Sequence, residues 1–115
     1  MAKTYELLID QGSTLSVLFT LKDEAGTALN LTGYTVRMQI RSSYASSIVV
    51  LNLSTTLGTI LLDPLLGKIT ITATAAVTAA LPAKRYVYDI ETVSASGFVT
   101  RFVQGNVVVS PEVTR

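Results

Sequence analysis

Apolar and polar residues alternate along most of this chain with a period of two. The apolar positions fall at every second residue in five runs, which are Tyr5, Leu7 and Ile9; Leu15, Val17, Phe19 and Leu21; Val36, Met38 and Ile40; Val49, Leu51 and Leu53; and Ile69, Ile71 and Ala73. Such alternation is typical of β-strands that bury one face. Turn-forming segments such as 23–27 recur about every ten residues, which is the spacing of an antiparallel sandwich or barrel.

One short segment has a helical rather than a β-strand pattern. Residues 75–80 are rich in alanine, Thr74 can cap their amino-terminal end, and Pro82 prevents the helix from continuing. We therefore expect one short helical turn near residues 75–80. The chain of 115 residues is predicted to form a single domain over residues 1–115. At this length the core is large enough to need no disulfide or metal.

Residues 85–92 are predicted to form a strand whose two faces differ in chemistry. Tyr86, Tyr88, Ile90 and Thr92 share one face, which is predicted to be buried. The opposite face carries polar residues, which are Arg85, Asp89 and Glu91. A hairpin loop at residues 95–97 then leads into a returning strand over residues 98–109.

The alternating pattern also predicts how these two strands pair. The expected partners are Thr92 with Thr100, Ile90 with Phe102, Tyr88 with Gln104 and Glu91 with Arg101. A slip of one residue would set Ile90 against a charged side chain, so the hydrophobic pattern selects this register. We expect Glu91 and Arg101 to form a cross-strand pair that contributes a few tenths of a kcal/mol.

Composition excludes several kinds of chemistry. The chain has no histidine and no cysteine, so Ser-His-Asp and Cys-His catalytic arrangements are impossible and the usual zinc ligands are missing. Nine Lys and Arg residues against eight Asp and Glu residues leave a net charge of +1, which creates no field for nucleic acid or an anionic membrane. We expect no enzymatic activity, no cofactor, no membrane span and no signal peptide.

Two polar groups nevertheless have a functional alternative. Asp89 and Glu91 are two residues apart on one strand face, about 6–7 Å by strand rise, which fits a glycosidase acid and base or a weak cation site. The stripe Arg37, Gln39 and Arg41, with Tyr34 and Tyr44 beside it, resembles a basic surface with aromatic platforms for nucleic acid. In both cases a solvated strand face is the favoured interpretation.

Several leucines exceed what one alternating core requires. These are Leu8, Leu18, Leu61, Leu62 and Leu66. They form either a second apolar surface, which would mark an assembly interface, or, for residues 61–66, a cover over one end of the sandwich. The sequence favours neither alternative.

Four blocks of the sequence resemble small immunoglobulin-like structural proteins of tailed bacteriophages. The blocks are residues 29–41 (LNLTGYTVRMQIR), 67–71 (GKITI), 83–91 (AKRYVYDIE) and 98–115, which end in GNVVVSPEVTR. Their order is similar to that in the amino-terminal domain of siphophage baseplate upper proteins and in short tail-associated proteins. The resemblance implies an all-β, immunoglobulin-like antiparallel β-sandwich of seven to nine strands. It carries over no catalytic residues.

The resemblance also implies a function. We expect a virion structural protein, assembled in the host cytoplasm, that serves in the tail or baseplate as an adaptor, hub or fibre-attachment component. Because the sequence ends at Arg115, a hub, adaptor or decoration role is expected rather than that of a longer baseplate protein. The alternatives are a capsid decoration or cement protein, and a carbohydrate- or nucleic-acid-binding module.

The expected partners are other phage structural subunits or further copies of the chain, and neither a membrane nor nucleic acid is expected. The polar side chains predicted to form an interaction face are Arg37, Gln39, Arg41, Arg85, Asp89, Glu91 and Arg101.

Overall fold

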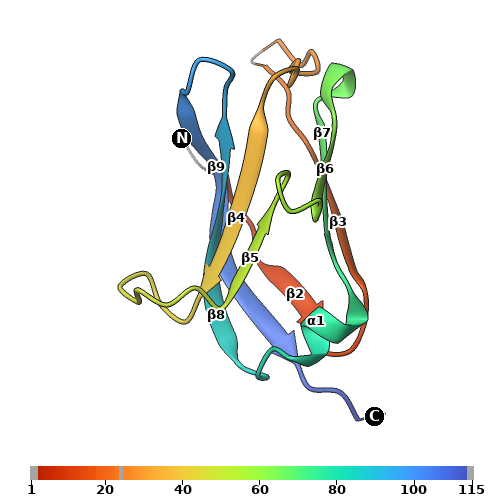
Figure 1. The fold of residues 1–115 in the computed structure, drawn as a ribbon, viewed down its shortest axis with the longest axis vertical. Helices are drawn as coiled ribbons and strands as arrows, with labels where there is room; N and C mark the ends of the chain where they lie inside the picture. The colour runs from red at the N-terminus through yellow and green to blue at the C-terminus, as the bar shows by residue number, and fades with distance from the viewer. Residues whose placement is uncertain (1–2, 24, 114–115) are drawn as a thin grey trace.

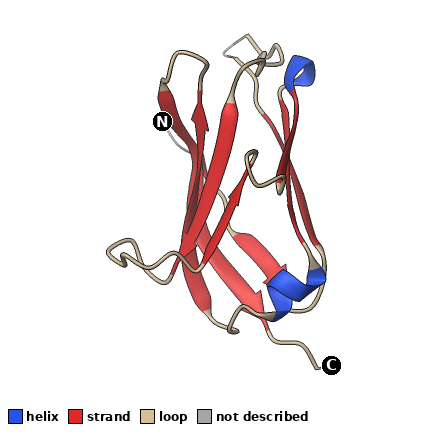
Figure 2. Cartoon of the chain, in the orientation of Figure 1, coloured by secondary structure: helices blue, strands red, loops and turns tan. Residues whose placement is uncertain are grey.

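The computed structural model describes residues 3–23 and 25–113, which form two β-sheets packed face to face (Figure 1). The elements of this part of the chain are β1 (Lys3–Thr4), β2 (Leu7–Asp10), β3 (Leu15–Thr20), β4 (Thr35–Arg41), β5 (Leu51–Ser54), β6 (Ile60–Asp63), the 3-10 turn η1 (Pro64–Leu66), β7 (Lys68–Ala73), α1 (Ala75–Ala79), β8 (Arg85–Val93) and β9 (Val99–Ser110). The expected immunoglobulin-like β-sandwich with one short helix is confirmed. Figure 2 shows the two helical segments at opposite ends of the molecule.

The two sheets divide the chain unequally. The larger has six strands in the order β1-β9-β8-β4-β5, with β2 also paired to β9, and the smaller has the order β3-β7-β6. Each strand buries alternate residues, as the period of two requires. Val36, Met38 and Ile40 of β4 are buried, and they meet Ile69 and Ile71 of β7 in one continuous core.

The helix α1 lies where the sequence predicts it and has the predicted cap. The Thr74 hydroxyl oxygen accepts a hydrogen bond from the Val77 amide (3.3 Å). Thr78 is fully buried, and its hydroxyl donates to the Ser13 carbonyl (2.8 Å) and accepts from the Gly12 amide (3.1 Å). The helix is thereby bonded to the turn between β2 and β3.

The entry into β8 is held by Tyr86. Its hydroxyl donates to the carbonyl of Pro82, four residues upstream, at 2.6 Å. Burial of the phenol raises the pKa of Tyr86 above its ordinary value, so the hydroxyl stays a donor. The arrangement corresponds to the tyrosine corner of immunoglobulin-like folds.

The pairing of β8 with β9 follows the predicted register only next to the hairpin. Thr92 lies opposite Thr100 and Glu91 opposite Arg101, as predicted. A β-bulge between Ile90 and Glu91 then shifts the ladder by one residue. The remaining predicted partners were therefore wrong.

The bulge has a cause in the sequence of β9. Ile90 faces Val103 instead of Phe102, and Tyr88 faces Gly105 instead of Gln104. Phe102 and Val103 are consecutive apolar residues, and the bulge lets both contact the core. Without it, the alternate residues beyond this point would be turned outward.

The amino-terminal strands add a parallel component to the expected antiparallel sandwich. Both β1 and β2 run parallel to β9. Between them the Tyr5 amide donates to the Gln104 carbonyl of β9 (3.0 Å), whereas the Tyr5 carbonyl accepts a hydrogen bond from the Tyr88 hydroxyl (2.7 Å). Gly105 lies directly beneath this carbonyl, and a Cβ atom added there would clash with the Tyr5 oxygen. The close approach of β9 to this segment therefore requires glycine.

Replacing Gly105 should destabilise the fold. In Gly105→Ala the new methyl group has to displace the Tyr5 backbone, and overpacking of this kind costs about 1–3 kcal/mol. Urea unfolding followed by far-UV circular dichroism measures the change in the free energy of unfolding. The neighbouring Asn106→Ala, at an exposed position of the same strand, should change it by less than about 0.5 kcal/mol. Equal stability of Gly105→Ala and the parent chain would contradict the assigned contact.

Candidate functional site

The outer face of the six-stranded sheet is polar across four strands. Strand pairing aligns two consecutive rows on β5, β4, β8 and β9, which are Ser54, Arg37, Glu91 and Arg101, and then Asn52, Gln39, Asp89 and Gln104. Strand alternation explains this arrangement, because the residues between them point into the core. Side chains from distant parts of the sequence therefore share one surface.

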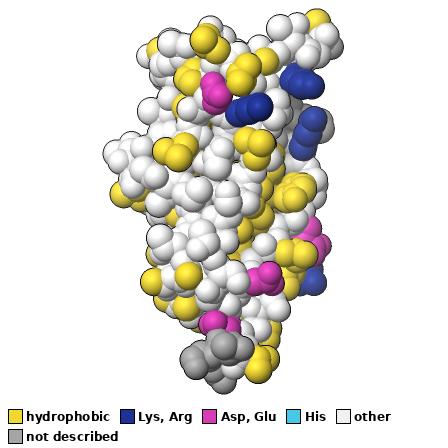
Figure 3. All heavy atoms as spheres, turned by 90° about the vertical axis from the view of Figure 1, so that its right-hand side faces the viewer, with side chains coloured by type: hydrophobic (Ala, Val, Ile, Leu, Met, Phe, Trp, Pro, Cys, Tyr) yellow, Lys and Arg dark blue, Asp and Glu magenta, His cyan; other side chains and the backbone are white. Residues whose placement is uncertain are grey.

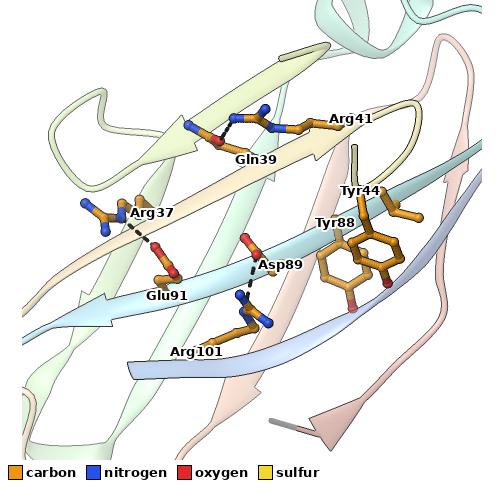
Figure 4. A pocket seen from close by; sticks show the side chains of 9 residues that line it. Arg37, Gln39, Arg41, Tyr44, Tyr88, Asp89, Glu91 and Arg101 are labelled. Atoms are coloured by element: carbon orange, nitrogen blue, oxygen red, sulfur yellow. Dashed lines mark hydrogen bonds and ion pairs between the residues drawn. The ribbon is translucent and has the colours of Figure 1, made fainter. Parts of the chain in front are cut away.

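A hollow of about 570 Å³ lies on this face, open to solvent (Figure 4). Its lining residues are Arg37, Gln39, Arg41, Tyr44, Val87, Tyr88, Asp89, Glu91 and Arg101. Six of the seven residues of the predicted interaction face thus lie together. The seventh, Arg85, is exposed farther along β8 opposite Val108 and does not line the hollow.

The ion pairs in the hollow differ from the predicted one. Glu91 accepts from Arg37 on β4, with 2.9 Å between Nε and Oε1, although Arg101 is its partner in the ladder on the other side. Arg101 instead reaches Asp89, with 3.4 Å between Nε and Oδ2. The predicted Glu91–Arg101 contact is therefore replaced by two others. The sequence pattern of the hairpin alone could not include Arg37, which comes from a third strand.

Arg41 connects the sheet to the loop that follows β4. One guanidinium nitrogen donates to the Ser46 carbonyl (2.6 Å) and another to the Gln39 side-chain oxygen (2.9 Å). The bond to Ser46 ties the 42–50 loop to β4, and Tyr44 of this loop borders the hollow while remaining 70% exposed. No sequence signal indicated that this loop would bring Tyr44 to the hollow.

Only one of the two tyrosines predicted to flank the arginine stripe lies beside it. Tyr44 borders the hollow, but Tyr34 is half-buried and packs against the core. An aromatic platform on both sides of Arg37 and Arg41 is therefore absent from the described residues.

Two groups that line the hollow have a raised pKa, the phenol of Tyr88 and the carboxyl of Asp89. Partial burial raises the pKa of Asp89, and the nearby Glu91 carboxylate raises it further. Arg101, Arg41 and Arg37 oppose this effect but do not cancel it. Among the described residues, Asp89 and Glu91 do not belong to a group of three or more acidic, histidine or cysteine side chains that could hold a metal ion. Each carboxylate contacts an arginine instead.

A second surface lies on the opposite side of the molecule. Of the surplus leucines, Leu18 on β3 and Leu61 on β6 are both exposed, at 56% and 57%, on the outer face of the three-stranded sheet. Each pairs with Thr70 of β7, so the three side chains form one row across the sheet. Figure 3, which views this side, shows hydrophobic side chains along its length.

The other surplus leucines have different positions. Leu66 follows in η1 and is exposed, whereas Leu62 packs against the core. Leu8 is exposed on β2, in the larger sheet. Because η1 buries none of its residues, the alternative in which residues 61–66 cover one end of the core accounts only for Leu62. A second apolar surface is the better description of Leu18, Leu61 and Leu66.

No protein-family model and no curated protein sequence matches the chain. Among solved structures, it is similar to CopC from Methylosinus trichosporium OB3b, with 12% identity over 95% of this chain and 89% of that chain and a TM-score of 0.48. That similarity is limited to the course of the chain and implies no shared ligand. Neither helical segment of residues 3–23 and 25–113 is long and apolar enough to cross a membrane.

The raised pKa of Asp89 predicts a pH-dependent stability change. A carboxyl whose pKa is higher in the folded state favours folding when it is protonated, and this contribution is lost as pH rises through the folded-state pKa. Asp89→Asn removes the charge at every pH, so its Tm should exceed that of the parent chain at pH 7. The difference should shrink below about pH 4, where the parent Asp is protonated as well.

Thermal unfolding followed by circular dichroism at pH 3 and pH 7 measures both differences. Asp10→Asn, at an exposed carboxylate outside the hollow, serves as the control for loss of one negative charge. A lower Tm for Asp89→Asn than for the parent chain at pH 7 would show that the Arg101 contact outweighs burial.

Proposed function

We propose that this chain is a structural protein of a bacteriophage virion, a component of the tail or baseplate that acts by protein–protein contact. The supporting sequence observation is the order of four blocks that resembles phage immunoglobulin-like proteins. The supporting structural observation is the leucine face, defined here as Leu18, Leu61, Leu65 and Leu66 on the outside of β3, β6 and η1. This face carries the proposal.

The leucine face is apolar enough to be buried against a partner protein. Leu18 and Leu61 flank Thr70 in a single row, and serine and threonine occupy neighbouring outward positions on β3 and β7. The charged residues Asp63 and Lys68 are ladder partners at the end of this face next to η1. Burying one leucine side chain contributes about 1.5–3 kcal/mol, so several together can drive association. Another structural subunit of the particle is the partner we propose for it.

A capsid decoration protein is the alternative within the same class. It would use the same apolar face but would be present in a different number of copies. The two roles differ in the number of copies per particle, which quantitative mass spectrometry of purified particles of the encoding phage measures. Tens of copies indicate a tail component, and hundreds indicate a shell protein. Absence of the chain from purified particles would overturn the virion proposal.

Charge on the leucine face should prevent assembly. In Leu18→Glu combined with Leu61→Glu, two carboxylates enter the row, and burying them against a partner is unfavourable. We expect incorporation into particles to fall at least about tenfold, which corresponds to about 1.4 kcal/mol of lost association free energy. Incorporation is measured by complementation with the tagged variant followed by immunoblotting of purified particles.

The matched control is Leu8→Glu, which makes the same change at a comparably exposed leucine of the other sheet. This variant should assemble normally, and circular dichroism should show that both it and the double variant are folded. Normal incorporation of the Leu18 and Leu61 double variant would exclude the leucine face as the assembly surface.

A further inference from the structure

The hollow on the six-stranded sheet lies on the other side of the sandwich from the leucine face and has a different chemistry. It combines three guanidinium groups, two carboxylates and one primary amide around a space of about 570 Å³. Its donors and acceptors are therefore mixed within a few ångströms, rather than segregated into a basic and an acidic patch. A ligand with alternating donors and acceptors would satisfy such a surface best.

The side chains of the hollow are already held in place. Arg37 is bonded to Glu91, Arg101 to Asp89, and Arg41 to Gln39. Fixing side chains before a ligand arrives lowers the entropy lost on binding. In small-ligand sites, polar groups that are already in position fix the orientation of the ligand.

The contacts within the hollow also leave hydrogen-bonding capacity for a ligand. Each carboxylate uses one oxygen for its arginine, Oε1 of Glu91 and Oδ2 of Asp89, and a carboxylate has two oxygens with about four acceptor sites. Gln39 uses its oxygen to accept from Arg41, which leaves the amide nitrogen as a donor. Neighbouring hydroxyl groups, each both donor and acceptor, match this combination.

Arg41 gives the hollow a site for one negative charge. Arg37 and Arg101 are each paired with a carboxylate, whereas the bonds of Arg41 within the described residues go to neutral oxygens of Gln39 and Ser46. A guanidinium group binds a carboxylate through two parallel hydrogen bonds. The excess of one cation over the anions in the hollow therefore fits a ligand that is acidic but mostly neutral.

Tyr44 provides an apolar contact at the border of the same hollow. Its ring is largely exposed, and the loop that carries it is fixed by the bond from Arg41 to Ser46. An aromatic ring in this position can pack against the C–H face of a sugar while polar groups bind the hydroxyls. Nucleic acid fits less well, because Asp89 and Glu91 would repel consecutive phosphates.

We propose that this hollow binds an acidic saccharide, with the sugar carboxylate on Arg41, hydroxyl groups on Gln39, Asp89 and Glu91, and the sugar ring against Tyr44. The site is independent of the leucine face and does not require the virion role.

The probe for this proposal is a hexamer of galacturonic acid, titrated into the full chain by isothermal calorimetry at low salt. We expect a Kd below about 1 mM, since a shallow site supplies only a few kcal/mol. Arg41→Ala and Tyr44→Ala should each weaken binding at least about fivefold. Because Arg41→Ala also releases the loop, Tyr44→Ala serves as the second variant, and circular dichroism confirms that both are folded.

Arg85→Ala is the matched control, because it removes an exposed arginine from the same face of β8 outside the hollow. It should bind the hexamer with unchanged affinity. Equal weakening by Arg85→Ala would reduce the interaction to general charge attraction and overturn the proposal.

Two other probes separate the alternatives. Maltohexaose, a neutral hexasaccharide, should bind more weakly than the acidic one, and equal affinity would remove the role of Arg41. A single-stranded oligo-dT of 12 nucleotides should bind more weakly still, and tighter binding that falls steeply with salt would assign the hollow to nucleic acid instead. No binding of the acidic hexamer at 5 mM would also overturn the proposal. The Leu18→Glu and Leu61→Glu double variant should bind the hexamer with unchanged affinity.

Discussion

The pairing of β9 with its neighbours is the interaction on which the rest of the structure depends. β9 pairs with β8 on one side and with β1 and β2 on the other, so one strand joins both ends of the described chain to the centre of the sheet. Its bulge places Phe102 and Val103 together against the core. The same bulge leaves Arg101 on the outer face within reach of Asp89. One β-bulge therefore determines both how β9 packs against the core and which of its side chains lie on the polar surface.

The sequence predicted the strands well because burial follows alternation directly. The strand with Val36, Met38 and Ile40, the faces of the strand that starts at Arg85, and the Thr74 cap all depend on contacts within a few residues. The register beyond Ile90 was mispredicted because alternation was extended through Phe102. The two consecutive apolar residues, Phe102 and Val103, were the available signal that the alternation of buried and exposed residues shifts by one at this point.

The candidate site was predicted in part, and for a similar reason. Alternation identified the outward residues on each strand, and six of them line the hollow. Which arginine contacts which carboxylate depends on the order of strands in the sheet, and this order is not encoded in any single strand. Tyr44 contributes through a loop that is held by Arg41, a contact with no periodic signature. Long-range order thus limited both the register and the site.

The position of β9 in the chain has a consequence for synthesis. It is the last strand described, yet the amino-terminal strands β1 and β2 have it as their only ladder partner among the described residues. While the ribosome is still translating residues 99–110, the first strands therefore have no edge to pair with, and β8 lacks the strand that pairs with one of its edges. Contacts between the two ends of a chain also slow folding, because a long loop has to close first. The nascent chain consequently reaches its native sheet only after β9 leaves the ribosome, and until then its apolar strands are accessible to chaperones.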